Sequence, residues 1–261
     1  MHIQTGFSLT RRGLWRFAPL ALPFAGNAYA AETVTDSFPA HPAEVVREMV
    51  TVAHGNVKRV RELVDARPSL AKAAVDWGFG DWEDALGAAS HVGNREIAEY
   101  LIGKGARPTL FSAAMMGQLD TVKAFLAAQP GAQRIAGPHS ISLLAHAKAG
   151  GKQSEAVYQY LDALGDAGPV KAAPLTAAEV AALTGSYVYG AGATERIEIT
   201  EKNGLLIFTR MGKPARNLVH TGEHTFYPVG AAAVKIHFSG AGENAALTVE
   251  DPDLILTARR T

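Results

Sequence analysis

Three segments of the chain repeat one pattern, and this repetition restricts the possible folds more than any other feature of the sequence. The segments span residues 55–64, 93–102 and 117–126 and align without gaps. Each begins with a glycine and places apolar residues five, eight and nine positions later. A looser fourth copy begins at Gly150 and needs a short insertion to align. Because apolar residues at this spacing share one helix face, the pattern predicts a stack of similar helical units.

The residues that precede these glycines resemble ankyrin repeats. That family has paired alanines before the glycine, and the chain has Ala88-Ala89 in the second copy and Ala113-Ala114 in the third. Small side chains at this place let the two helices of one unit approach closely. The resemblance covers residues 42–164, and it implies an irregular all-α solenoid of three to four repeats.

The repeats depart from the family pattern in three ways. The spacings between successive glycines are 38, 24 and 33 residues. The family's Thr-Pro and His signature is missing, and the first copy has Thr51-Val52 in place of paired alanines. An atypical first copy is expected of a terminal repeat that caps a solenoid.

The apolar period changes from helical to alternating in the last third of the chain. Residues 165–175 are rich in Gly, Pro and Ala, which is typical of a linker. Thr176 and Glu179 form a capping box that opens one short helix. From Gly185 onward apolar residues alternate with polar ones, and Asn203-Gly204 predicts a hairpin turn. Seven or eight such strands predict a small antiparallel barrel or sandwich over residues 176–261.

The C-terminal pattern resembles the lipocalin-like barrels that are appended to penicillin-binding-protein-like serine hydrolases and some peptidases. The resemblance rests on residues 183–187, a following strand, and Asn203-Gly204-Leu205. It prompts a search for a hydrolase, and Ser69 and Lys72 do match Ser-x-x-Lys. His220-Thr221-Gly222 is a variant of the Lys-Thr-Gly element, but no Tyr-x-Asn or Ser-Asp-Asn lies between it and Ser69, so we interpret the match as chance and expect no enzyme.

The first thirty residues have the pattern of an export signal. Arg11, Arg12 and Arg16 precede an apolar run over residues 17–25, and Ala28-Tyr29-Ala30 provides a small-x-small cleavage site. Paired arginines resemble a twin-arginine signal; a Sec signal is the alternative. We therefore expect cleavage after about Ala30, a periplasmic location and no transmembrane segment in the mature chain. The predicted organisation is an α+β multidomain chain with signal 1–30, repeats 31–164, linker 165–175 and barrel 176–261.

Charge and cysteine content narrow the function further. The whole chain has 25 basic and 25 acidic side chains and no cysteine. Removing residues 1–30 takes away three arginines, which leaves 22 basic and 25 acidic groups and a net charge of −3. This balance argues against a nucleic-acid partner. Without cysteine the chain has no disulfide, thiolate metal site or cysteine nucleophile.

The sequence predicts no metal site and no cofactor. His54 and His91 lie just before repeat glycines, where we expect them to cap helix ends rather than bind metal. His220, Glu223 and His224 lie about a Thr-Gly turn, which we interpret as solvated.

Residues 76–84 form an aromatic and acidic insertion that accounts for the long first spacing. Its predicted partner-binding residues are Trp77, Phe79, Asp81, Trp82 and Glu83. Exposed aromatic rings on a short stem are suited to protein recognition. The alternative is that the tryptophans fold back onto a repeat or meet the barrel, with Asp81 and Glu83 left at the rim.

Two neighbouring residues could extend this predicted surface. They are His91 and Met115, although packing of Met115 is the alternative. The resulting hypothesis is a monomeric exported interaction module that binds a protein or peptide partner in the cell envelope. The second hypothesis is a small molecule or lipid inside the barrel, with the repeats as a docking arm.

Overall fold

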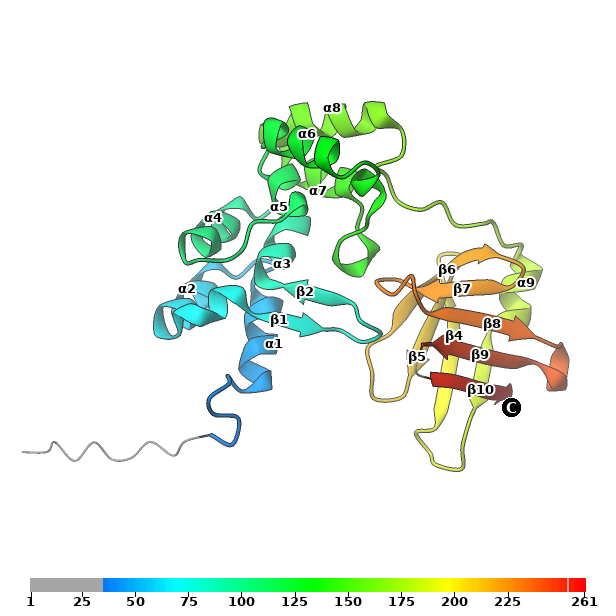
Figure 1. The fold of residues 1–261 in the computed structure, drawn as a ribbon. Coiled ribbons are helices and arrows are strands. Elements are labelled where there is room, and N and C mark those ends of the chain that lie inside the picture. The colour runs from blue at the N-terminus through cyan, green and yellow to red at the C-terminus, as the bar shows by residue number, and fades with distance from the viewer. Residues whose placement is uncertain (1–34, 253) are drawn as a thin grey trace, which may run out of the picture.

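A computed structural model describes residues 35–252 and 254–261, which form a helical part followed by a β-barrel (Figure 1). The predicted export signal, residues 1–30, lies outside the described residues. The predicted change from helices to an antiparallel barrel is confirmed, so the chain is an α+β protein. None of the described helices combines the length and apolar character that a membrane span requires.

Eight of the described helices form four consecutive pairs. The pairs are α1 (Ala43–Val52) with α2 (Val57–Ala66), α3 (Ala85–His91) with α4 (Arg95–Gly103), α5 (Leu110–Met115) with α6 (Leu119–Ala128), and α7 (Leu143–Ala149) with α8 (Glu155–Leu164). The first helices contact one another in chain order, from α1 through α3 and α5 to α7. Among the second helices, α2 contacts α4 and α6 contacts α8. The pairs are therefore stacked side by side (Figure 1).

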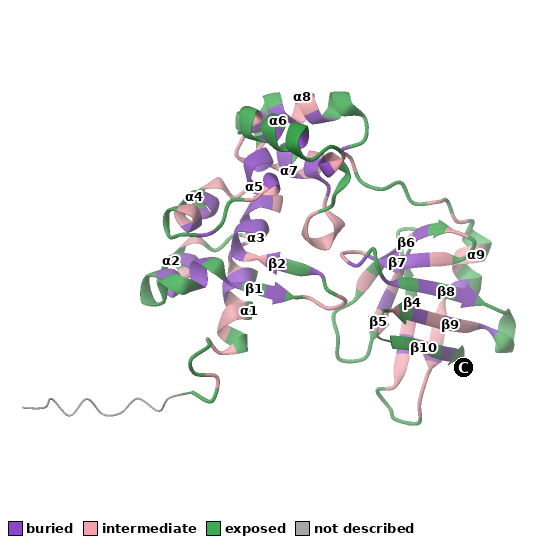
Figure 2. Cartoon of the chain, viewed as in Figure 1, coloured by how far each residue is buried: buried purple, intermediate pink, exposed green. Residues whose placement is uncertain are grey.

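The sequence specifies where these helices begin. Asn56, Asp84, Asn94, Thr109 and Ser142 each accept a hydrogen bond from the backbone N–H three residues later. Such N-caps satisfy one of the amide groups that a helix start leaves without an internal partner. The paired alanines Ala88-Ala89 and Ala113-Ala114 are at most 3% exposed and lie in the apolar cores between the helices (Figure 2).

The repeated glycines turn the chain between the two helices of a pair. Gly93 and Gly117 have φ angles of +75° and +74°, in the left-handed region that favours glycine. A Cβ atom at either position would also collide with a backbone carbonyl oxygen, that of Ala149 or of Gln153. At Gly93 and Gly117 the pattern therefore reflects both a turn and a close approach between helix pairs, whereas a Cβ at Gly55 would meet no atom within 4 Å.

Eight antiparallel strands close the barrel in the order β10-β3-β4-β5-β6-β7-β8-β9. They are β3 (Gly185–Val188), β4 (Arg196–Lys202), β5 (Leu205–Arg210), β6 (Arg216–Gly222), β7 (Thr225–Pro228), β8 (Lys235–Ser239), β9 (Ala246–Asp251) and β10 (Leu254–Arg260). Asn203 and Gly204 join β4 to β5 with φ angles of 55° and 79°, as the turn signal predicts. Helix α9 (Ala177–Leu183) begins with the predicted capping box of Thr176 and Glu179.

The barrel interior is filled by side chains. Tyr187, Ile197, Ile236, Phe238 and Leu247 are at most 3% exposed and belong to one apolar cluster. The rings of Tyr187 and Phe238 pack edge to face with centroids 5.7 Å apart. This packing follows from the alternation of apolar and polar residues, because every second side chain of a strand points into a barrel.

Residues 165–175, the predicted linker, contact both parts of the chain. The buried Ala167 accepts a hydrogen bond from the Leu144 backbone N–H at 3.1 Å. Farther along, the Ala173 N–H donates to the His220 carbonyl of β6 at 2.8 Å. The segment is thus attached at each end by backbone hydrogen bonds.

Candidate functional site

The predicted insertion folds as a β-hairpin that reaches from the helices to the barrel (Figure 1). Strands β1 (Ala74–Asp76) and β2 (Trp82–Asp84) pair, with Asp76 opposite Trp82. At the tip, Gly78, Phe79 and Gly80 all have positive φ angles, of 113°, 57° and 74°. Three such residues in succession make a tight reversal; the two glycines adopt these angles without strain, whereas a positive φ is uncommon for a bulky residue such as Phe79.

The hairpin tip packs against the barrel. The Phe79 ring meets Phe208 of β5 edge to face, with centroids 6.1 Å apart. Asp81 forms an ion pair with Arg216 of β6 at 2.9 Å. Nearby, the Gly230 N–H donates to the Ser140 hydroxyl at 2.7 Å. The hairpin is therefore a contact between the two parts, as one of the sequence alternatives suggested, and Phe79 is the aromatic residue that makes it.

The expectation that Asp81 and Glu83 lie at an exposed rim is wrong. They are only 2% and 1% exposed, whereas Trp82 between them is 64% exposed. The reason is the alternation of a β-strand, which places residues 81 and 83 on the inner face and residue 82 on the outer face. Trp77 is half-buried and donates its indole N–H to Glu83 at 2.8 Å.

The other two predicted surface residues are also largely buried. Met115 is 0% exposed because it packs in the apolar core of the first helix pairs. The His91 side chain is 8% exposed and faces Glu83. Of the seven predicted partner-binding residues, Trp82 is the most exposed.

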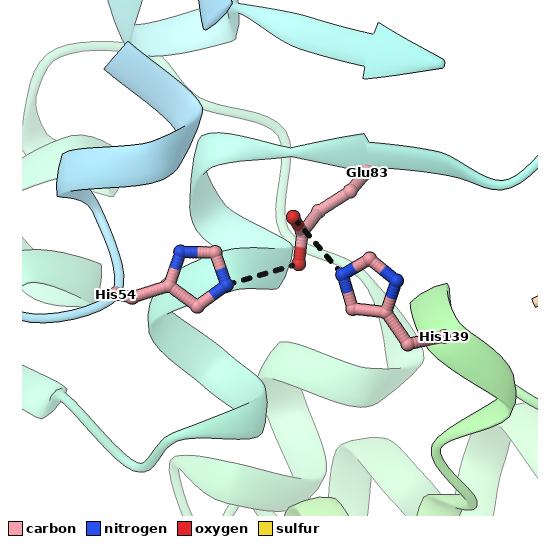
Figure 3. Close-up of side chains that lie close together, drawn as sticks. All are labelled: His54, Glu83 and His139. Carbon is pink, nitrogen blue, oxygen red and sulfur yellow. Dashed lines mark ion pairs between the residues drawn. The ribbon is translucent and has the colours of Figure 1, made fainter. Parts of the chain in front are cut away.

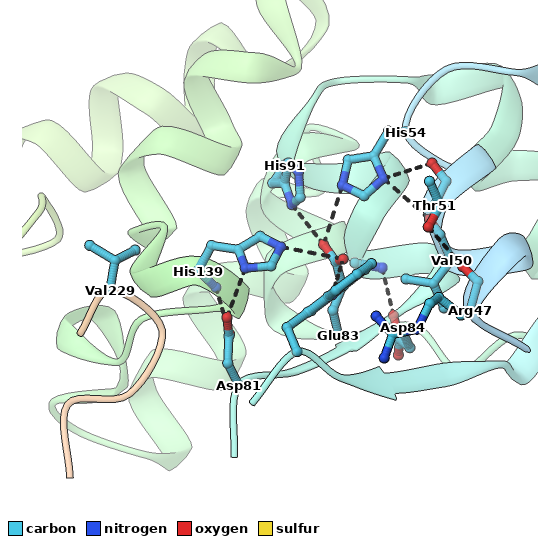
Figure 4. Close-up of polar contacts among 12 residues, drawn as sticks. Arg47, Val50, Thr51, His54, Asp81, Glu83, Asp84, His91, His139 and Val229 are labelled. Atoms are coloured by element: carbon cyan, nitrogen blue, oxygen red, sulfur yellow. Dashed lines mark hydrogen bonds and ion pairs between the residues drawn. The ribbon is translucent and has the colours of Figure 1, made fainter. Parts of the chain in front are cut away.

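Glu83 is the centre of a histidine cluster (Figures 3 and 4). Its Oε1 lies 3.2 Å from His91 Nδ1 and 3.7 Å from His54 Nε2. Its Oε2 lies 3.4 Å from His139 Nε2. Donor atoms of His54, Glu83 and His139 all lie within 4.8 Å of one another, which makes these three residues potential metal ligands.

Four separate segments supply the cluster. His54 follows α1, Glu83 lies in β2, His91 ends α3, and His139 lies in the short 3-10 helix Pro138–Ser140 between α6 and α7. His54 does cap its helix, as predicted, because its Nδ1 lies 3.2 Å and 3.0 Å from the carbonyl oxygens of Val50 and Thr51. Its other nitrogen faces Glu83, which the capping interpretation did not include.

The electrostatics of the cluster favour charged groups. Burial alone would raise the pKa of Glu83, but the neighbouring rings of His139 and His91 and the Trp77 indole N–H lower it to about 2. Hydrogen bonds to Asp81 and Glu83 raise the pKa of His139 to about 9. The pKa of Asp81 is lowered as well, since His139 and Arg216 outweigh the effect of burial. Without another cation in the cluster, His139 is therefore positive at neutral pH and neutralises part of the negative charge.

A cleft of about 280 Å³ opens beside the hairpin, between α1 and the barrel. Its walls carry four cationic side chains and one acidic group, together with three aromatic rings. These residues are Arg47, Arg210, Lys213 and Arg216, then Asp76, then Trp77, Phe79 and Phe208. The Arg47 guanidinium lies 5.0 Å from the centre of the Trp77 ring. A second cleft of about 280 Å³ shares Trp77, Pro214 and Arg216 with the first and adds His139.

Three of these cations have no carboxylate partner among the described residues, although Arg210 Nε donates a hydrogen bond to the Tyr189 hydroxyl at 3.0 Å. Arg47, Arg210 and Lys213 are exposed and form no ion pair with any carboxylate in the described part of the chain. Arg216, in contrast, is engaged by Asp81 and by the Val229 carbonyl. The cleft therefore attracts negative charge although the chain as a whole is neutral.

The remaining polar motifs of the sequence lie apart from this site. Ser69 is exposed, and its hydroxyl lies 2.6 Å from His41 Nε2. In the barrel, His220 Nδ1 lies 3.2 Å from the Ala173 carbonyl, and His224 is 4.0 Å from Glu179. Glu223 and His224 are exposed, as the solvated turn predicts. For His220 that prediction is wrong, because the residue is 8% exposed and its ring stacks on Phe226 with centroids 4.7 Å apart.

Comparison with known proteins finds no matching family model and no matching curated protein. The site is consequently interpreted from its own geometry. His139 is the member that the sequence did not reveal, because it lies in a connection without any repeat signature. The shared position of His54 and His91 before repeat glycines was the one sequence signal that pointed to the cluster.

Proposed function

We propose that the chain is an exported, non-enzymatic binding protein whose helical part is an ankyrin-type solenoid. The stacking of four helix pairs, the buried paired alanines and the left-handed glycines at the turns support the solenoid. The twin-arginine-type signal at residues 1–30 supports export to the periplasm. A mass spectrum of the protein purified from the periplasm tests export, because cleavage after about Ala30 is expected.

The proposed occupant of the cleft is an acidic peptide segment of another envelope protein. The observation that carries this proposal is the group of three exposed cations, Arg47, Arg210 and Lys213, around aromatic rings. Guanidinium groups bind carboxylates through paired hydrogen bonds, and aromatic rings add apolar contact area. A volume of about 280 Å³ holds a few side chains, which fits a peptide segment better than a large cofactor.

The proposed partner surface therefore differs from the one that the sequence predicts. The insertion contributes Trp77 and Phe79 to the cleft wall instead of projecting freely. Trp82 stays available as an apolar anchor on the outer face of the hairpin. The proposed partner contact is thus the junction of the repeats and the barrel, not the tip of an insertion that projects into solvent.

A fluorescent peptide of alternating glutamate and tryptophan is a direct probe of this proposal. Binding measured by fluorescence anisotropy should weaken by at least about tenfold in Arg47→Glu/Lys213→Glu, and it should weaken as salt is added. Arg107→Glu/Lys152→Glu is the matched control, since it changes the net charge equally at two exposed cations that lie outside the cleft. Equal affinity of the two variants, or binding that persists in the double variant, would refute the proposal.

The second hypothesis, a ligand inside the barrel, has less support. The interior is occupied by a continuous apolar cluster that includes Tyr187, Phe226 and Phe238. The two clefts with aromatic and cationic walls lie beside the hairpin, outside this cluster. Residues of the helical part line both clefts, so in the first proposal the repeats contribute part of the binding surface and are more than a docking arm.

A further inference from the structure

Two buried polar atoms of the histidine cluster lack a hydrogen-bond partner within the described residues. They are Glu83 Oε1 and His91 Nδ1. The side chains are 0% and 8% exposed, so solvent has little access to either. A buried acceptor without a donor typically costs about 1–3 kcal/mol, and more when it is charged. The two atoms lie 3.2 Å apart, so a cation that binds both would stabilise them.

The orientation of His54 supports the same conclusion. Its Nδ1 lies within hydrogen-bond distance of two backbone carbonyl oxygens, so this nitrogen carries the proton. In a neutral ring Nε2 then has a lone pair, and it faces the Glu83 carboxylate oxygen at 3.7 Å. Two electron-rich atoms facing each other are stable when a cation lies between them.

His139 has an equivalent arrangement. Its Nδ1 lies 2.8 Å from Asp81 Oδ2, while its Nε2 points to Glu83. A histidine that donates one N–H to a carboxylate or carbonyl and presents its other nitrogen to the site is typical of metal ligands in proteins. Asp81 and the carbonyl groups after α1 would thus orient the two rings.

We propose that His54 Nε2, His139 Nε2 and the Glu83 carboxylate bind one Zn²⁺ ion, with His91 Nδ1 as the fourth donor. Nitrogen and carboxylate ligands suit zinc, whereas Mg²⁺ and Ca²⁺ prefer oxygen alone. Donors at zinc bonding distances of about 2.1 Å lie about 3.4 Å apart in a tetrahedron. The donor atoms of His54, Glu83 and His139 lie up to 4.8 Å apart, so binding requires side-chain movements. His91 Nδ1 lies 3.2 Å from Glu83 Oε1 and joins the set through that contact.

The ion has a route into the site and a structural role there. The side chains of His54 and His139 are 34% and 31% exposed, which opens one side of the cluster to solvent. Four protein donors leave no open position for substrate, as in structural zinc sites. The ion would connect the turn after α1, the hairpin, α3 and the segment that precedes α7.

Zinc titration of the folded, untagged protein tests the proposal after chelator treatment and dialysis. Isothermal calorimetry should give one zinc ion per chain, and Co²⁺ in its place should give the intense visible absorption of a tetrahedral site. Zinc should also raise the melting temperature, and Mg²⁺ should not. Trp77 fluorescence should respond, because its indole N–H bonds to Glu83.

Two double variants distinguish zinc binding at this site from weak zinc binding by histidines on the surface. His54→Ala/His139→Ala should reduce zinc affinity by at least about tenfold. His224→Ala/His237→Ala removes two histidines of the barrel and should leave the affinity unchanged. His54→Ala alone, at a partly exposed position, provides a test if the double variant does not fold. Failure to bind zinc stoichiometrically, or equal binding by both pairs of variants, would overturn the proposal.

Discussion

The Arg216 guanidinium lies 2.9 Å from the Asp81 carboxylate, and the two residues come from opposite parts of the chain. Their side chains are 10% and 1% exposed. Asp81 also accepts hydrogen bonds from the backbone and the ring of His139. One carboxylate in the hairpin therefore joins a barrel strand to the segment before α7. Figure 4 shows the contact of Asp81 with His139.

Arg216→Ala should destabilise the protein by about 3 kcal/mol, because it leaves a buried carboxylate with fewer partners. Urea unfolding monitored by circular dichroism measures this loss. The exposed pair of Arg134 and Asp166 is the control, with side chains 62% and 39% exposed. Arg134→Ala should cost less than about 1 kcal/mol. Similar costs for the two substitutions would mean that the Arg216 pair does not hold the parts together.

Gly93→Ala should destabilise the fold by about 2 kcal/mol or more, since it combines a left-handed φ with a clash against the Ala149 carbonyl oxygen. Gly103 lies at the end of α4, and a Cβ there would meet no atom within 4 Å. Gly103→Ala should therefore stabilise by about 0.5–1 kcal/mol. Thermal unfolding of the two variants should shift in opposite directions; shifts in the same direction would contradict the argument.

His146 should make stability depend on pH. Burial lowers its pKa to about 4, and its neighbours are His91, 6.4 Å away ring to ring, and the Phe111 ring. An unfolded histidine titrates near pH 6.5, so between about pH 6.5 and 4 the unfolded chain binds a proton that the folded chain does not. Stability should fall by about 3 kcal/mol over this range as pH decreases.

His146→Asn keeps a donor for the Ser142 carbonyl, which His146 Nδ1 contacts at 2.9 Å, and removes the titration. The difference in unfolding free energy between this variant and the native protein should change with pH between 6.5 and 4. Urea titrations at several pH values measure it. A difference independent of pH would exclude His146 as the source.

Ile236→Ala tests whether the barrel interior is a packed core. Ile236 is 0% exposed, and its truncation should cost about 3 kcal/mol through lost burial and a new cavity. Ile255, on β10, is 77% exposed, so Ile255→Ala should change stability by no more than about 0.5 kcal/mol. A small cost at Ile236 would indicate that the lumen has space for a ligand.

Local sequence rules predicted the secondary structure well. The capping box at Thr176, the Asn203-Gly204 turn and the alternating strands depend on neighbouring residues, and all three are present in the structure. Gly93 and Gly117 of the repeated pattern correspond to left-handed turns for a similarly local reason. The sequence could therefore predict the repeated helices, α9 and the alternation of the barrel strands, but not the short strands β1 and β2.

The site was predictable only in part, because it depends on contacts between distant segments. The sequence predicts no strand in residues 76–84, so it gives no basis for assigning their side chains to an inner or an outer face. Asp81 and Glu83 were therefore expected on the surface. Once β2 is known to be a strand, its alternation explains their burial. His139 reaches Glu83 across a separation of 56 residues, and Arg216 reaches Asp81 across 135. No periodic pattern encodes such pairs.

The residues between α8 and α9 are not the only connection between the helices and the barrel. The hairpin forms a second, noncovalent one through Phe79 and Asp81. A protease that cuts once near Pro169, in an exposed stretch of that segment, should therefore yield two fragments that still migrate as one particle on a sizing column. Cleavage of the chain would then not by itself separate the two parts, and the cleft between them would persist until they dissociate.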